Sequence, residues 1–239
     1  IEIEIGGQVI DKHYGEWMAL WTELSMISTT PLQALIGGQG MDTKQVSVPL
    51  QFWFCRNPGL ALPLIALQYH EVRLNIQMIP NNLYPKFKNQ TIENFNVWCD
   101  YIYLDTDERR RFAQISHEYL IEQLQFSNTV TLPEVRNLDP ASTTNFKTYT
   151  MDLYLNHPVK ELIWVMINQE DDANNDWEKY LITNTSVLQL NGQDRFQTRQ
   201  GTYFVYTQRN DYHTSQTSAN NGLKPHIYSF GLKPEQHQP

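Results

Sequence analysis

The chain has 239 residues, of which 41% are hydrophobic and 12% aromatic, so it carries enough apolar side chains to build a core. Its formal net charge of −8 argues against a surface that neutralises phosphates, and we expect no direct nucleic-acid partner. The sequence has no run of about 18 apolar residues, so we expect no transmembrane segment. Cys55 and Cys99 each stand in an apolar run, which predicts two buried thiols instead of a disulfide framework.

The first predicted element is a half-buried strand at residues 1–5, where isoleucine alternates with glutamate. Gly6 and Gly7 end this strand. A helix is predicted near residues 14–26, because four apolar side chains there follow the helical spacing i, i+3, i+4, i+7: Trp17, Leu20, Trp21 and Leu24. We expect these four side chains to form one buried face against the first domain.

Three more strands are predicted before the middle of the chain, at residues 46–54, 72–78 and 94–104. The second of these alternates apolar and polar residues, and the other two are rich in aromatic residues. Residues 105–112 then break the pattern with six charged side chains. We predict a domain boundary at this break, although an ordinary charged loop or helical turn would give the same pattern.

The second half repeats the strand signals, at residues 149–155, 162–167, 202–207 and 226–231. The run 162–167 is continuously apolar, as in a strand that is covered on both faces. Asn191 and Gly192 follow a short apolar run and predict a tight hairpin turn. Many short strands with a single firm helix predict an all-β protein, such as a sandwich, a barrel or a jelly roll.

The candidate catalytic and metal-binding residues do not match a known motif. The seven histidines include no His-x-His pair, and the zinc-protease pattern that begins at His117 fails because Ile121 stands where the second histidine must lie. We therefore expect no catalytic residue, no metal ion and no cofactor. Asn89 and Asn184 each begin an N-x-S/T triplet and are candidate glycosylation sites.

Several stretches carry a more specific pattern. Ile-Glu-Ile-Gly-Gly-Gln-Val-Ile-Asp at residues 3–11 is followed by Trp17 and Trp21, and residues 48–72 read from Val-Pro-Leu-Gln-Phe-Trp-Phe-Cys-Arg-Asn-Pro-Gly to Gln-Tyr-His-Glu-Val. The matching stretches farther along the chain are residues 101–123, 153–164, 190–196 and 228–239. In this order, the stretches resemble the major capsid proteins of nucleocytoplasmic large DNA viruses.

The resemblance implies a double jelly roll, that is, two eight-stranded antiparallel β-sandwich domains. Residues 1–108 would be the C-terminal part of the first jelly roll and residues 109–239 the N-terminal part of the second. Because family members carry strands before Ile1 and after Pro239, we expect both jelly rolls to be incomplete at the ends of this chain.

The function that the resemblance implies is structural and not enzymatic. The protein would form homotrimers that act as pseudo-hexagonal capsomers of an icosahedral shell. Its partners would be neighbouring capsomers and minor capsid proteins, and its location the virion capsid after assembly in the host cytoplasm.

Two other classes of protein remain open from the residues alone. A carbohydrate-binding, lectin-like β-sandwich would explain the tryptophan, tyrosine and asparagine residues in loops. A jelly-roll metalloenzyme of the cupin type would need a metal ion. A discrete trimer, saturable sugar binding and stoichiometric metal distinguish the three classes.

Overall fold

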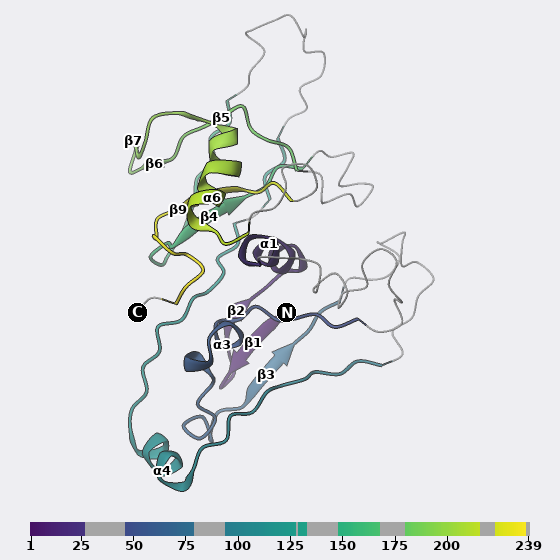
Figure 1. Cartoon of the computed structure of the whole chain (residues 1–239), viewed down its shortest axis with the longest axis vertical. Coiled ribbons are helices and arrows are strands. Elements are labelled where there is room, and N and C mark those ends of the chain that lie inside the picture. Colours follow the sequence, from purple (N-terminus) through teal and green to yellow (C-terminus); the bar gives the residue numbers. More distant parts are fainter. Residues whose placement is uncertain are drawn as a thin grey trace, which may run out of the picture.

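The computed structural model describes residues 1–26, 46–78, 94–127, 129–132, 148–167, 180–215 and 223–237. Its elements form two lobes, with helix α1 (Gly15–Ser25) between them and helix α4 (Thr106–Gln114) at one end of the molecule (Figure 1). The first lobe contains β1 (Glu2–Ile5), β2 (Gln8–Lys12), α3 (Trp53–Arg56), the 3-10 turn η1 (Pro58–Leu60) and β3 (Val72–Asn75). The second lobe contains β4 (Glu161–Trp164), β5 (Thr185–Ser186), β6 (Gln189–Leu190), β7 (Gln193–Asp194), β8 (Arg199–Gln200), the π-helical turn η4 (Tyr203–Thr207), α6 (Gln208–Tyr212) and β9 (His226–Ser229).

The first lobe is built on an antiparallel sheet in the order β2-β1-β3. The turn between β1 and β2 needs glycine, since Gly6 and Gly7 have φ angles of +60° and +83°. A side chain at Gly6 would also meet Nδ1 of His70 at 2.7 Å. In β3, half-buried and exposed residues alternate, as the sequence pattern predicts. The strand predictions at residues 1–5 and 72–78 are confirmed over Glu2–Ile5 and Val72–Asn75.

The core of the first lobe is apolar and aromatic. Its buried members are Ile3, Phe52, Trp53 and Leu60. The strand predicted at residues 46–54 is wrong, because residues 46–52 have no regular secondary structure and α3 is a single helical turn. Phe52 and Trp53 are consecutive and both buried, whereas a strand would send them to opposite faces. The helical turn allows both rings to enter the same core.

Two irregular segments differ most from the sequence-based expectation. Residues 94–105 and 148–160 have no regular secondary structure, so the strands predicted at 94–104 and 149–155 are wrong for the described structure. The segment 94–105 lacks a neighbouring strand among the described residues, and its aromatic side chains are exposed; Trp98 and Tyr103 are each 91% exposed. Cys55 and Cys99 are exposed free thiols, which corrects the expectation that both are buried.

The second lobe is organised around the antiparallel pair β4–β9, in which Ile163 faces Ile227. The predicted strands at residues 162–167 and 226–231 are confirmed over these two elements. All residues of β4 are half-buried, so its cover on both faces is partial. The predicted hairpin is also confirmed: β6 pairs with β7, and Asn191 and Gly192 have φ angles of 52° and 78°.

The strand predicted at residues 202–207 is wrong, because this segment is helical from residue 201 to residue 212. Its buried residues follow a helical and not an alternating pattern: Phe204, Val205, Gln208 and Arg209. Two of these four residues are polar, so a search for apolar residues at helical spacing does not detect the buried face. The described part of the chain is therefore a mixture of short strands and helices and not purely β.

Candidate functional site

Helix α1 is the element that contacts both lobes. The ring of Trp21, which is buried, stacks on Trp17 with 5.5 Å between centroids. Arg56 of the first lobe lies over the Trp21 ring at 5.0 Å, and His213 of the second lobe meets it edge-on at 6.3 Å. We call this region the α1 joint and define it by residues Trp21, Glu23, Leu24, Arg209, His213 and Ser215.

The C-terminal turn of α1 is capped by residues from the other lobe. The last four carbonyl groups of a helix have no partner within the helix and must be satisfied elsewhere. The Glu23 carbonyl accepts a hydrogen bond from Nη2 of Arg209 at 2.8 Å, and the Leu24 carbonyl accepts one from the Ser215 amide at 3.1 Å. Residues about 190 positions downstream therefore complete this helix end.

Arg209 is the polar centre of the joint. It is 9% exposed and its Nη2 lies 3.0 Å from Oε1 of Glu23 and 3.1 Å from Oγ of Ser215. Its Nη1 donates to the carbonyl of Leu223 at 3.1 Å. A cation at a helix C-terminus also interacts favourably with the helix dipole. The guanidinium thus joins α1, the turn after α6 and the segment before β9.

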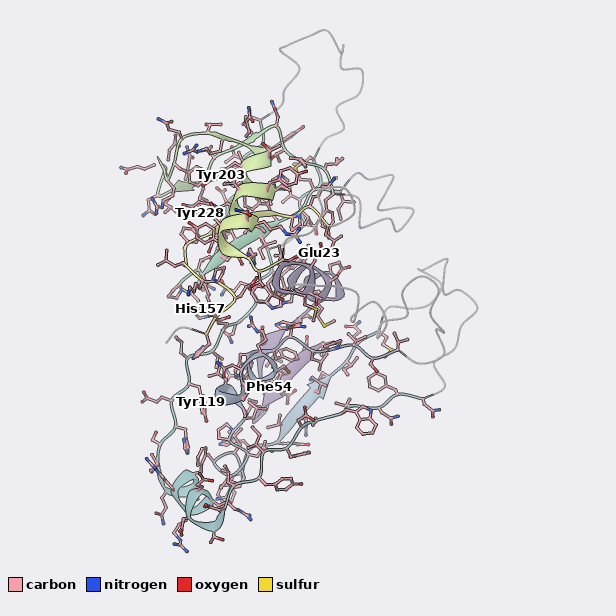
Figure 2. The ribbon with its side chains drawn as sticks, in the orientation of Figure 1. Glu23, Phe54, Tyr119, His157, Tyr203 and Tyr228 are labelled. Carbon is pink, nitrogen blue, oxygen red and sulfur yellow. The ribbon has the colours of Figure 1, made fainter. Side chains whose placement is uncertain are left out.

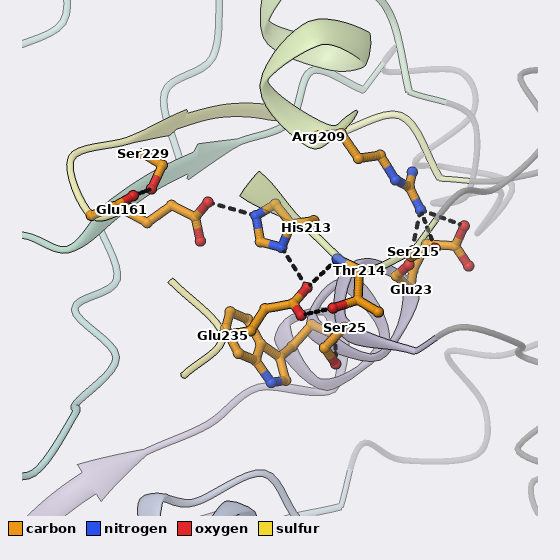
Figure 3. A network of polar contacts seen from close by, with 11 residues as sticks. Glu23, Ser25, Glu161, Arg209, His213, Thr214, Ser215, Ser229 and Glu235 are labelled. Atoms are coloured by element: carbon orange, nitrogen blue, oxygen red, sulfur yellow. Dashed lines mark hydrogen bonds and ion pairs between the residues drawn. The ribbon is translucent and has the colours of Figure 1, made fainter. Parts of the chain in front are cut away.

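His213 follows α6 and lies between two carboxylates (Figure 3). Its Nε2 is 2.6 Å from Oε1 of Glu161 and its Nδ1 is 3.0 Å from Oε1 of Glu235. The His213 side chain has 0% exposure. Burial on its own would lower the pKa of His213, but the hydrogen bonds to Glu161 and Glu235 outweigh burial and raise this pKa to about 9.

A second connection runs along the segment 119–126, which we call the strap. Tyr119 and Ile121 of the strap pack against the first-lobe core, as does Phe54. Figure 2 shows Phe54 and Tyr119 in the first lobe, and Tyr203 and Tyr228 in the second lobe. The Leu124 amide donates to Oδ1 of Asp11 at 3.0 Å. The strap therefore follows the first lobe although it lies beyond α4 in the sequence.

Glu122 of the strap connects the two lobes electrostatically. One of its carboxylate oxygens lies 3.3 Å from Nη1 of Arg56, and the other pairs with Nζ of Lys160. Lys160 in turn donates to the carbonyl of Gln236 at 2.7 Å. These groups are partly exposed, so the chain of contacts is weaker than the buried joint at α1.

Comparison with known proteins decides the family. The model described as "Major capsid protein N-terminus" matches residues 1–105, and the model described as "Large eukaryotic DNA virus major capsid protein" matches residues 108–239. The second match alone spans more than half of the chain. The chain belongs to the major capsid protein family of large eukaryotic DNA viruses. The α1 joint consequently links the parts of the chain that the two family models cover.

The relatives of this capsid-family chain come from several viruses. It is 40% identical, over 272 aligned positions, to the major capsid protein of Pyramimonas orientalis virus, and 36% identical over 285 positions to that of Paramecium bursaria Chlorella virus 1. These alignments cover 100% of this chain but 64% and 62% of the two relatives. A quasi-atomic model of the PBCV-1 virus capsid contains a chain that superposes on this one with a TM-score of 0.72 and is 36% identical to it. The match covers 100% of this chain and 65% of the chain in that capsid.

The residues that the sequence singled out lie in different places. Three of the four stripe residues on α1 are buried, with Leu24 at 0% exposure, whereas Trp17 is half-buried. Asn184 is exposed directly before β5, and Asn89 lies outside the described residues. Within the described ranges, no group of three His, Cys, Asp or Glu side chains is arranged to hold a metal ion. No helix in the same ranges is long and apolar enough to cross a bilayer.

Sequence reasoning missed the polar residues of the joint. Glu161, Arg209 and Glu235 carry no motif, and their charged partners His213 and Glu23 lie 22 to 186 residues away in the chain. Nothing in local spacing identifies them. The one available signal is the charged residues beside apolar runs, such as Glu161 before Leu162–Trp164.

Proposed function

We propose that this chain is part of a structural shell protein, which assembles as a homotrimer into the pseudo-hexagonal capsomers of an icosahedral capsid of a large DNA virus. The observation that carries the proposal is the likeness along the whole chain to a chain of the PBCV-1 virus capsid, with a TM-score of 0.72. The working location would be the virion capsid, after assembly in the host cytoplasm. Neighbouring capsomers and minor capsid proteins would be its partners.

The exposed apolar side chains support a role inside a larger assembly. Within residues 94–105, Trp98 and Tyr103 are almost fully exposed. Four further aromatic or β-branched side chains are more than half exposed: Phe95, Val97, Tyr101 and Ile102. A soluble monomer rarely shows such an apolar surface. The shell role therefore fits these residues better than the carbohydrate-binding alternative, which works as an isolated domain.

We propose two eight-stranded jelly rolls in the full-length protein, with the boundary between residues 108 and 109. Strand pairing supports this division, because among the described residues β1–β3 pair only with one another and β4–β9 pair only with one another. The matches to the two family models also change over close to this boundary, since one ends at residue 105 and the other begins at residue 108. Helix α4 lies between the halves, and none of its residues is buried.

Trypsin tests the division, because Arg109, Arg110 and Arg111 lie on the exposed helix α4. We expect brief digestion of the folded full-length protein to cut at this helix and to leave two fragments that elute together, held by the α1 joint. Replacing the three arginines by glutamine is the matched control and should remove the cut. Loss of all cooperative melting after this single cut would contradict the division.

Light scattering on the full-length protein tests the shell function. We expect a discrete particle of three chains, and hexagonal outlines in negative-stain images. A monodisperse monomer at high protein concentration would contradict the proposal. A glycan array on the same sample tests the carbohydrate-binding alternative, for which saturable binding by a monomer is the expected outcome.

We also propose Asn184 as a glycosylation acceptor. It begins the triplet Asn184-Thr185-Ser186, and its exposed position before β5 supports access by a transferase. Intact mass and peptide mapping of the protein from virions test this. A peptide that carries Asn184 without added mass would contradict it, and Asn184→Gln is the control for the assignment of the modified site.

A further inference from the structure

His213 is held in an arrangement that only one of its protonation states satisfies. Both ring nitrogens point at carboxylate oxygens, at 2.6 Å to Glu161 and 3.0 Å to Glu235 (Figure 3). An ionised carboxylate only accepts hydrogen bonds, and a neutral imidazole has one donor nitrogen and one acceptor nitrogen. Two donors are needed here, so the geometry requires the imidazolium form whenever both carboxylates are ionised.

Glu235 is held in its ionised form by its other contacts. Its Oε1 also accepts from the Thr214 amide at 2.8 Å, and its Oε2 accepts from the Thr214 hydroxyl. Burial alone would raise the pKa of Glu235, but the hydrogen bonds from His213 and Thr214 lower it overall. A neutral His213 would therefore direct a lone pair at one of two anionic groups inside the protein.

The cluster connects segments that are distant in the chain. Glu161 is the first residue of β4, and Glu235 lies beyond β9. His213 begins the turn 213–215, which is bonded to the end of α1 through the Ser215 amide. The ring of His213 also contacts Trp21 of α1. One proton thus holds β4, the segment after β9 and the turn after α6 at the α1 joint.

We propose that His213 is a proton-operated clamp that closes the second lobe and holds it on helix α1. When protonated, it fixes the segment 230–237 to β4 and keeps the turn 213–215 on helix α1. Loss of the proton releases Glu235 or Glu161 and loosens the α1 joint. The clamp concerns contacts within one chain, so it does not depend on the proposed role in a viral shell.

The pH range of the clamp follows from the direction of the His213 shift. The pKa of His213 is raised from 6.5 to about 9, so its stabilisation is complete below pH 6.5 and is lost as the pH rises through 9. The other charged groups on the elements packed around it are Arg209 and Asp211 on α6, Glu16 and Glu23 on α1, Lys160 before β4, and Lys233 in the segment 230–237. The other buried histidine of this lobe, His226, has its pKa lowered by burial to about 4 and stays neutral throughout this range.

The test is the melting temperature of the full-length protein between pH 6 and pH 10. We expect a decrease above neutral pH that His213→Gln abolishes, since glutamine does not titrate. In Glu235→Gln, the midpoint of the decrease should move down by about one pH unit or more, because the ring loses an anionic neighbour. His157→Gln, at an exposed histidine outside the joint, is the matched control and should leave the profile unchanged.

Hydrogen exchange at pH 7 supplies a local measurement. We expect faster exchange in His213→Gln for residues 20–26 and 223–237, and unchanged exchange in β3 of the first lobe. The clamp is overturned if His213→Gln keeps the alkaline decrease, or if Glu235→Gln leaves its midpoint in place. If His213→Gln does not fold, the midpoint shift in Glu235→Gln decides the question alone.

Discussion

The two lobes are stabilised in different ways. The core of the first lobe consists of apolar and aromatic side chains, with Phe52 stacked between His13 at 4.3 Å and Phe54 at 5.6 Å. Among its described residues, the second lobe buries more polar than hydrophobic side chains, and the polar ones include Gln208, Arg209, His226 and Ser229. Burial of apolar surface is tolerant of geometry, whereas buried polar groups require specific partners.

This difference determines how each lobe responds to change. The apolar core of the first lobe loses stability in proportion to the apolar surface that a mutation removes. The polar exception in this lobe is the buried pair of Asp11 and His13, whose Oδ2 and Nε2 atoms are 2.9 Å apart. The second lobe depends on hydrogen bonds that involve titratable groups, so its stability varies with pH. The stability of the α1 joint should vary with pH in the same way as that of the second lobe, because the contacts of the joint are made by Arg209 and His213.

The largest effect is expected for Phe52→Ala. The Phe52 side chain is fully buried, and removing a buried phenylalanine costs about 3–5 kcal/mol of unfolding free energy. Denaturant unfolding at low and high salt should give the same loss. Tyr69→Ala, at a residue that is 88% exposed, is the control and should change the unfolding free energy by less than about 0.5 kcal/mol. A salt-dependent loss in Phe52→Ala would break the contrast between the lobes.

The same contrast explains what the sequence could predict. Period-two patterns identified β1 and β3, and the helical stripe identified α1, because in these elements one face is apolar and the other polar. The hairpin turn was predictable since it requires positive φ angles at both central positions, and Asn191 and Gly192 are residue types that adopt them. The segment 201–212 was misread because Gln208 and Arg209 complete its buried face. Their partners lie in distant parts of the chain, which local periodicity does not report.

The strands at 94–104 and 149–155 failed for another reason. Strand propensity describes a side-chain pattern that fits a sheet, but a strand forms only when a neighbour supplies hydrogen bonds. The described residues contain no such neighbour for 94–104. The polar contacts of the α1 joint could not be predicted from the sequence, because no spacing rule connects Glu23 with Arg209 across 186 positions.

The next effect concerns the buried ion pair of the joint. Arg209→Met leaves Glu23 with 13% side-chain exposure and without its cation, for which we expect a loss of about 3 kcal/mol. The double variant Glu23→Gln/Arg209→Met should recover part of this loss, because no unpaired charge remains. Lys12→Met breaks the exposed pair with Glu2, at 2.9 Å, and should cost much less unfolding free energy than Arg209→Met. Equal losses in Arg209→Met and Lys12→Met would show that the joint is not a buried contact.

A smaller effect is expected at His226, on the acid side of the stability profile. The Nε2 atom of His226 accepts a hydrogen bond from the Thr183 amide at 3.1 Å, and protonation removes this acceptor. Burial lowers the pKa of His226 from 6.5 to about 4, so its stabilisation is present above pH 6.5 and is lost as the pH falls through 4. His226→Gln should therefore show a smaller decrease in melting temperature between pH 6.5 and pH 4 than the unchanged protein.

The control for this acid limb is Leu60→Ala in the core of the first lobe, which should shift the whole profile and keep its shape. If His226→Gln and the unchanged protein lose the same number of degrees between pH 6.5 and pH 4, the second lobe does not owe its acid sensitivity to this histidine.

The smallest effect is expected at the edge of the second lobe, in the turn between β6 and β7. Gly192 has a φ angle of 78°, which costs a residue with a side chain about 1 kcal/mol, so Gly192→Ala should lower the unfolding free energy by that amount at every pH. Gly15→Ala is the matched control, because Gly15 lies in the first turn of α1 with open space around it and no positive φ angle. That variant should be neutral or slightly stabilising. If Gly192→Ala is equally neutral, the hairpin of β6 and β7 is not formed in solution, and the ordered part of the second lobe ends before this edge.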